Sequence, residues 1–148
     1  MLIELKKGWR AMDLQESVRI YLQKQPEIVF AYLFGSYIKG SLGPDSDIDI
    51  AIYIDSPNLK IEKYLEIKNG LTDICERDVD LVILNEAQPL IKYKVYQDGV
   101  ILFSRSPKLL SNFQVRTLFE YEDIKNYLTL SYKKMIERTR KEVAGNGR

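Results

Sequence analysis

Residues 28–54 read IVFAYLFGSYIKGSLGPDSDIDIAIYI, and this stretch decides the fold. Two apolar runs, at residues 28–34 and 48–54, are rich in β-branched and aromatic side chains and are typical of strands buried in a sheet. The segment between them is rich in Gly and Ser, which is typical of a turn. Asp47 and Asp49 open the second run. We therefore expect two core strands, with acidic side chains gathered where the second strand begins.

Helices and strands alternate on both sides of this stretch. The spacing of apolar residues predicts helices at residues 13–25, about 59–76 and 88–97. It predicts further strands at residues 79–84 and 100–103. Asp13, followed three positions later by Glu16, resembles a helix capping box. Strands that alternate with helices predict an α/β fold in which helices cover a sheet.

The last third of the chain has a different pattern. Residues 113–142 contain neither Gly nor Pro, and apolar side chains recur there every three or four positions. This predicts one long helix, or two joined at a kink, in a helical segment at about residues 107–143. Thirty helical residues extend about 45 Å, so part of the helix must fold back or project. A projecting part would bind a partner or a second copy through Tyr121, Tyr127 and Tyr132, whereas the alternative is a helix packed over the sheet.

The composition predicts one domain over residues 1–148, with a core at about residues 13–104. Lys and Arg total 22 against 21 Asp and Glu, so the charge does not indicate a surface for long DNA or RNA. No apolar run approaches the roughly 20 residues of a membrane span, and the first residues lack the pattern of a signal peptide. The single cysteine, Cys75, excludes an internal disulfide, so we expect a buried thiol and a cytoplasmic protein.

The chain contains no histidine, which excludes several kinds of active site. Ser-His-Asp triads, Cys-His pairs and histidine-bound zinc all require an imidazole. Acid-base chemistry and metal binding would therefore fall to carboxylates, lysines or tyrosines. Oxygen ligands select hard cations such as Mg²⁺ or Mn²⁺, which usually accompany phosphate substrates.

Three aspartates are candidates for such a metal site. Asp47 and Asp49 lie two residues apart in the predicted strand, so they share one face at a separation of about 6.7 Å. Asp80 interrupts the next apolar strand and supplies a third carboxylate, for which Asp78 is the alternative. Like charges about 4 Å apart repel by about 1 kcal/mol in water and about 4 kcal/mol at an effective dielectric of 20. The cluster is unfavourable without cations, which predicts a metal site.

Two divalent ions about 3.5 to 4 Å apart are the usual device for a displacement at phosphorus. We expect Asp47 and Asp49 to hold both ions and Asp80 to complete the site of the ion that activates the attacking hydroxyl. Gly35 and Ser36 follow a strand, where a backbone without Cβ can approach phosphate closely, so we expect them to hold the terminal phosphates of a nucleotide. Lys39 and Ser46 are candidates for further phosphate contacts.

The segment GSYIKGSLGPDSDIDI resembles the GSx10DxD signature of the DNA polymerase beta-like nucleotidyltransferase superfamily, and in particular its minimal nucleotidyltransferases. Gly35, Ser36, Asp47 and Asp49 match the motif, and Asp80 matches its third acidic position. The resemblance covers most of residues 14–103 and implies a mixed sheet flanked by helices, with ATP as the substrate. Tyr37 departs from it, because many members carry arginine at that position.

The C-terminal segment, with LFEYEDIKNYL followed by SYKKMIER, is similar to the tail of minimal nucleotidyltransferase antitoxins that pair with HEPN-domain toxins. The resemblance implies that the protein uses Mg-ATP to transfer AMP to a tyrosine of a HEPN ribonuclease. Two alternatives stay open. One is the same chemistry on a small hydroxylated molecule such as an aminoglycoside, and the other is a binding module that inhibits its partner without catalysis.

Overall fold

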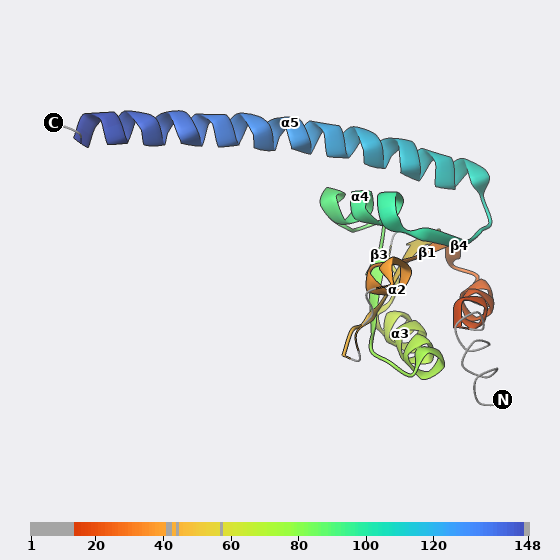
Figure 1. Cartoon of the computed structure of the whole chain (residues 1–148). Coiled ribbons are helices and arrows are strands. Elements are labelled where there is room, and N and C mark those ends of the chain that lie inside the picture. The colour runs from red at the N-terminus through yellow and green to blue at the C-terminus, as the bar shows by residue number, and fades with distance from the viewer. Residues whose placement is uncertain (1–13, 41–42, 44, 57, 147–148) are drawn as a thin grey trace.

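The computed structural model describes residues 14–40, 43, 45–56 and 58–146 as a four-stranded sheet with helices on both faces (Figure 1). The strands are β1 (Ile28–Phe34), β2 (Ile48–Ile54), β3 (Val79–Ile83) and β4 (Val100–Ser104). The helices are one at residues 14–23, α2 (Ser36–Lys39), α3 (Ile61–Cys75), α4 (Pro89–Asp98) and α5 (Pro107–Asn146). The predicted α/β fold is confirmed. The short α2 was not predicted as a helix, and the proposed cap at Asp13 lies outside the described residues.

The sheet has the strand order β3-β2-β1-β4. Strand β1 pairs antiparallel with both β2 and β4, whereas β2 and β3 run parallel. The parallel pair requires a crossover connection, and α3 provides it. The sheet is therefore mixed, as the resemblance implied, and its parallel half contains the strands that carry the predicted aspartates.

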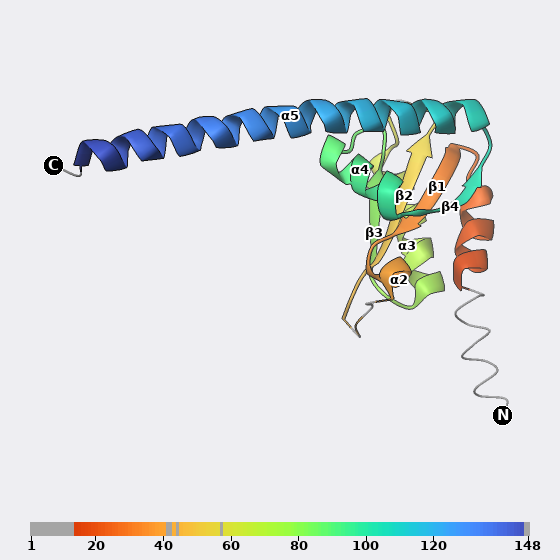
Figure 2. The same cartoon turned by 45° about the horizontal axis from the view of Figure 1, so that its top comes forward.

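Helices cover both faces of the sheet, so β1 is buried along its whole length. The helix at residues 14–23 and α3 pack on one face, where the isoleucines of β2 meet Val18, Leu22, Ile67 and Leu71. Helix α4 and the first turns of α5 pack on the other face, where Val95 and Phe113 meet Phe30, Tyr32 and Ala51. Figure 2 shows α4 between the sheet and α5. Since side chains alternate along a strand, Asp49 faces the side of the sheet that α4 and α5 cover.

Helix α5 is a single unbroken helix, and most of it projects beyond the sheet (Figures 1 and 2). Its first part is anchored, because Phe113 packs against Phe30 with 5.4 Å between ring centroids, and Tyr121 stacks on Tyr93 of α4 at 3.6 Å. From residue 125 to residue 145 nearly every side chain is exposed. Of the predicted alternatives, the structure therefore shows one helix rather than two, and it shows projection rather than folding back.

Cys75 lies at the end of α3 and is buried, as expected. Burial disfavours the charged thiolate and raises the pKa of this thiol to about 11. Among the described residues, no helix combines the length and the apolar character needed to cross a membrane.

The anchor of α5 gives the first testable prediction. Phe113 is 7% exposed within a cluster of aromatic rings, whereas Phe119, on the same helix, is 68% exposed. We expect Phe113→Ala to lower the free energy of unfolding by about 3 to 5 kcal/mol, because it removes a buried ring and leaves a cavity. Phe119→Ala is the matched control and should change it by less than about 0.5 kcal/mol. Urea denaturation followed by circular dichroism measures both, and equal losses would contradict the packing described here.

Candidate functional site

Asp49 and Asp80 are paired side by side in the parallel ladder between β2 and β3. Neighbouring strands lie about 4.8 Å apart, so the two carboxylates leave the same face of the sheet close together. Asp47 immediately precedes β2 and is exposed, as is Asp80, while Asp49 is half-buried. The pKa of Asp49 is raised, mainly by burial and further by the charges of Asp80 and Asp47. The three predicted aspartates therefore form one electrostatic cluster.

The alternative third carboxylate, Asp78, is placed differently. Its backbone oxygen accepts a hydrogen bond from the Ile48 N–H at 3.0 Å, which fixes the start of β2 against the start of β3. Its side chain is not among the groups that shift the pKa of Asp49, whereas that of Asp80 is. The geometry favours Asp80 over Asp78 as the partner of Asp49.

The cluster consists only of oxygen donors, which suits Mg²⁺ or Mn²⁺. Burial raises the pKa of Asp49 most, and repulsion from Asp80 and Asp47 raises it further. A divalent cation relieves this repulsion. Within the described ranges, however, no three acidic or cysteine side chains converge closely enough to enclose an ion by themselves. A cation held here would need further oxygen ligands, such as nucleotide phosphates, beside Asp47, Asp49 and Asp80.

Gly35 lies directly against the Asp49 carboxylate. Its φ of 77° and ψ of −150° form a backbone conformation that residues with a side chain rarely adopt. Gly35 immediately precedes α2. A Cβ at this position would lie 1.9 Å from Asp49 Oδ2, which is impossible without moving the carboxylate. Glycine is required here by a close approach to an aspartate of the cluster. Ser36 follows at the first position of α2 and is half-buried, so the predicted Gly35–Ser36 pair and Asp49 are brought together.

Lys39 and Ser46 already have partners within the protein. Lys39 Nζ lies 3.3 Å from Asp98 Oδ2, which joins α2 to the last turn of α4. The Ser46 hydroxyl accepts a hydrogen bond from the Gly43 N–H at 3.0 Å. Arg77 donates to the Gly43 backbone oxygen at 2.7 Å and to that of Ser46 at 3.3 Å. Arg77 was not singled out from the sequence, and it holds the loop that leads into Asp47.

Tyr37 does not take over the role of the arginine found in many superfamily members. Its ring packs against the core cluster that lies under α3, on the face of the sheet opposite to Asp49. Burial also raises the pKa of its phenol. Tyr37 therefore contributes to packing and supplies no positive charge to the site.

Sequence reasoning also missed Lys94, an exposed lysine of α4. Its charge lowers the pKa of Asp49 and so opposes the effects of burial, Asp80 and Asp47. The sequence does place Lys94 four residues before Asp98, and this spacing predicts that both side chains leave α4 on the same side.

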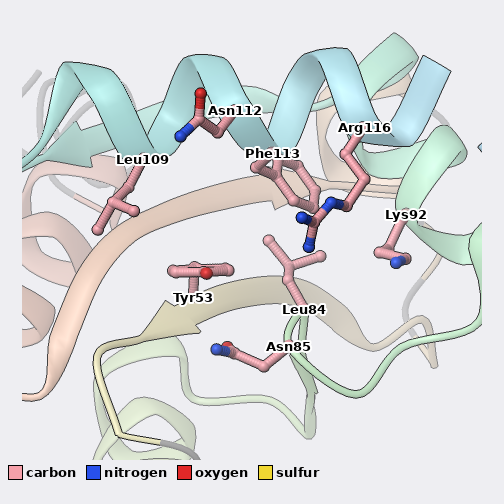
Figure 3. Close-up of a pocket in the computed structure, with 8 residues that line it drawn as sticks. All are labelled: Tyr53, Leu84, Asn85, Lys92, Leu109, Asn112, Phe113 and Arg116. Atoms are coloured by element: carbon pink, nitrogen blue, oxygen red, sulfur yellow. The ribbon is translucent and has the colours of Figure 1, made fainter. Parts of the chain in front are cut away.

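A separate cavity of about 240 Å³ lies at the opposite end of the sheet (Figure 3). Strands β2 and β3 lead from the aspartate cluster toward it, and α5 closes it from above. Figure 3 shows the Arg116 guanidinium pointing from α5 toward Leu84. The cavity is lined by Tyr53, Leu84, Asn85, Lys92, Leu109, Asn112, Phe113 and Arg116. None of the predicted site residues lines it, so it is not part of the aspartate site.

Two named relatives are similar to this chain in sequence. The protein adenylyltransferase MntA of Aphanizomenon flos-aquae is 30% identical over 127 residues, which are 76% of this chain and 81% of the relative. The protein adenylyltransferase MntA of Shewanella oneidensis is 29% identical over 109 residues, which are 72% of this chain and 76% of the relative.

The fold is also similar to that of solved structures. A crystal structure described as a toxin-antitoxin with AMP-PNP matches with a TM-score of 0.71 and 26% identity, over 82% of this chain and 98% of the matched chain. The model of the family described as polymerase beta, nucleotidyltransferase, matches residues 16–108, which include the Gly35–Ser36 turn and all three aspartates. With this match over most of its length, the chain belongs to the polymerase beta nucleotidyltransferase family and is a nucleotidyltransferase.

Proposed function

We propose that this nucleotidyltransferase transfers AMP from ATP to a tyrosine hydroxyl of a HEPN-domain ribonuclease and acts as the antitoxin of that toxin. The observation that carries the chemistry is the in-register pair of Asp49 and Asp80, with Gly35 against the Asp49 carboxylate. The choice of AMP is supported by the similarity to relatives named as protein adenylyltransferases. The absence of disulfides fits a reducing compartment, and we propose that the protein works in the cytoplasm.

In this reaction the tyrosine oxygen attacks the α-phosphorus of ATP. A new oxygen–phosphorus bond forms, the bond between the α-phosphorus and the bridging oxygen breaks, and pyrophosphate leaves. The phenolic proton must depart as the bond forms, and we propose the Asp80 carboxylate as its acceptor. The products are an AMP-tyrosine ester on the partner and free pyrophosphate.

We propose that Asp47, Asp49 and Asp80 bind the Mg²⁺ ions of Mg-ATP. When bound, Mg²⁺ would lower the pKa of the attacking hydroxyl and neutralise negative charge on the phosphates. The Gly35 backbone and the Ser36 hydroxyl are proposed to contact the terminal phosphates from the turn beside Asp49. Lys39 and Ser46 would add contacts only by exchanging their present partners, Asp98 and Gly43.

The acceptor is proposed to be a protein because of α5. The projecting part of this helix exposes large apolar side chains, each between 52% and 70% exposed, and these are Tyr127, Leu128, Leu130, Tyr132, Met135 and Val143. Exposed apolar side chains along a projecting helix are typical of a surface that binds another protein. A small hydroxylated acceptor would not require such a surface. We propose that the HEPN partner docks along this helix, as the resemblance of the C-terminal segment implies.

The proposal predicts a covalent change in the partner. Incubation of the HEPN protein with this protein, ATP and Mg²⁺ should add one or more AMP units, each visible as a discrete increment in the intact mass. The Asp47→Asn, Asp49→Asn double variant should keep the fold and lose transfer by at least about a thousandfold, because the proposed Mg²⁺ and phosphate contacts disappear. Mass spectrometry measures the transfer, and circular dichroism checks the fold.

Other outcomes of this experiment separate the alternatives. Inhibition of the toxin without any gain in mass would contradict the proposal in favour of a binding antitoxin. AMP transfer to an aminoglycoside but not to the partner would favour a small-molecule acceptor. Full transfer by the double variant would contradict the assignment of Asp47 and Asp49.

Two glycines allow a matched test of the contact with Asp49. Gly35 and Gly40 both have positive φ, 77° and 72°, but a Cβ at Gly40 would meet nothing within 4 Å. Gly40→Ala should therefore cost about 1 kcal/mol of stability through backbone strain alone and keep transfer activity. Gly35→Ala adds a collision with Asp49 Oδ2 and should lower kcat by at least about a hundredfold. Steady-state kinetics compares the two, and equal losses would show that strain, not the carboxylate contact, decides activity.

A further inference from the structure

Helix α4 presents three different sides to its surroundings. Val95 faces the sheet and is fully buried among Tyr32, Phe34 and Ala51. Lys92 and Tyr93 face α5, since Lys92 Nζ lies 2.7 Å from Glu120 Oε2 and Tyr93 stacks on Tyr121. Both Figure 1 and Figure 2 show α4 held in this way between the sheet and α5. The orientation of α4 about its own axis is therefore fixed by contacts on two sides.

The third side of α4 faces the aspartate site. Asp98 pairs with Lys39, which lies three residues after Ser36 in α2. Lys94 lies one helical turn before Asp98, so its side chain leaves the helix on the same side. The next residue, Val95, packs in the same cluster as Phe34, and Phe34 pairs with Asp49 across β1 and β2. Lys94 therefore lies close to the face of the sheet from which Asp49 projects, and its charge acts on Asp49. Lys94 thus shares the side of α4 that pairs with α2, the helix that begins at the Gly35–Ser36 turn.

The other lysines of α2 and α4, and Arg77 beside the loop before Asp47, already have partners. Lys39 pairs with Asp98, Lys92 pairs with Glu120, and Arg77 donates to the backbone oxygens of Gly43 and Ser46. The Lys94 side chain is exposed, and in the part of the chain that the structure describes its ammonium group makes no hydrogen bond and no ion pair. A free ammonium group beside three carboxylates is available to a second anion that binds at the same place.

We infer that Lys94 is the cation through which this protein binds the triphosphate of its nucleotide, reaching it from α4 while the Gly35–Ser36 turn holds it from the other side. The inference rests on the proposed function, because that function brings a triphosphate to the aspartates. A triphosphate carries up to four negative charges into a cluster that is itself negative, so a cation directed at the phosphates offsets part of the repulsion. Within the motif segment, Lys39 is paired with Asp98, and Tyr37, where many members of the superfamily carry arginine, packs against the core.

Nucleotide binding tests this inference without relying on turnover. In the full chain with Mg²⁺, titration calorimetry should show that Lys94→Met raises the Kd for the non-hydrolysable analogue AMP-PNP by about ten- to a hundredfold, because a charge-assisted contact is lost. Lys94→Arg keeps the charge and should bind within about threefold of the wild-type protein. Lys92→Met is the matched control on the same helix and should leave the Kd unchanged, because Lys92 faces α5.

Each result has one meaning. If wild-type protein binds AMP-PNP and Lys94→Met binds it equally well, the inference about Lys94 is wrong while the proposed function stands. If wild-type protein binds no AMP-PNP in the presence of Mg²⁺, the proposed function itself fails, and the inference fails with it. If Lys92→Met weakens binding as much as Lys94→Met, the effect comes from the general charge of α4, which also overturns the inference. Should Lys94→Met not fold, Lys94→Gln provides the same comparison at this exposed position.

Discussion

The parallel register of β2 and β3 sets Asp49 beside Asp80, and the rest of the site depends on this pairing. The two strands begin together because the Ile48 N–H donates to the Asp78 backbone oxygen, and α3 provides the crossover that makes them parallel. If the register of β2 shifted by one residue, the Asp49 side chain would point into the core under α3, and Ile48 or Ile50 would point to the other face of the sheet. The isoleucines of β2, all buried in that core, therefore fix the position of the acidic side chains.

This pairing is unfavourable for the isolated fold. Burial and the charges of Asp80 and Asp47 raise the pKa of Asp49, so ionisation of this carboxyl lowers the stability of the native state. The surrounding residues restrict this cluster further. Gly35, which has no Cβ, leaves the space that the Asp49 carboxylate occupies, and Arg77 holds the loop before Asp47. An arrangement that is held in place against its own repulsion is typical of a site built to bind cations and phosphates.

Much of the fold and of the site followed from the sequence. The strands at residues 28–34 and 48–54, the long final helix and the position of Asp47, Asp49 and Asp80 in their strands rest on apolar periodicity and on alternation along strands, which are local properties. The in-register pairing of Asp49 with Asp80 joins two distant strands and came only from the structure. The surroundings of three other residues depend on contacts between segments that are distant in the sequence, and these residues are Lys39, Lys94 and Gly35. The Lys39–Asp98 pair and the effect of Lys94 on Asp49 require α4 to be placed on a particular face of the sheet, and the closeness of Gly35 to Asp49 requires β1 to pair with β2 in one register. No single motif in the sequence specifies that placement.

Thermal unfolding with and without Mg²⁺ shows whether Asp47, Asp49 and Asp80 bind a divalent cation, as we propose. In EDTA, Asp49→Asn should unfold at a higher temperature than the wild-type protein, by roughly 3 °C or more, because the substitution removes the repelled charge. Addition of millimolar Mg²⁺ should raise the Tm of the wild-type protein and leave that of Asp49→Asn nearly unchanged, since only the native wild-type cluster binds the ion. An equal rise in both proteins, or a wild-type protein that Mg²⁺ does not stabilise, would contradict the account.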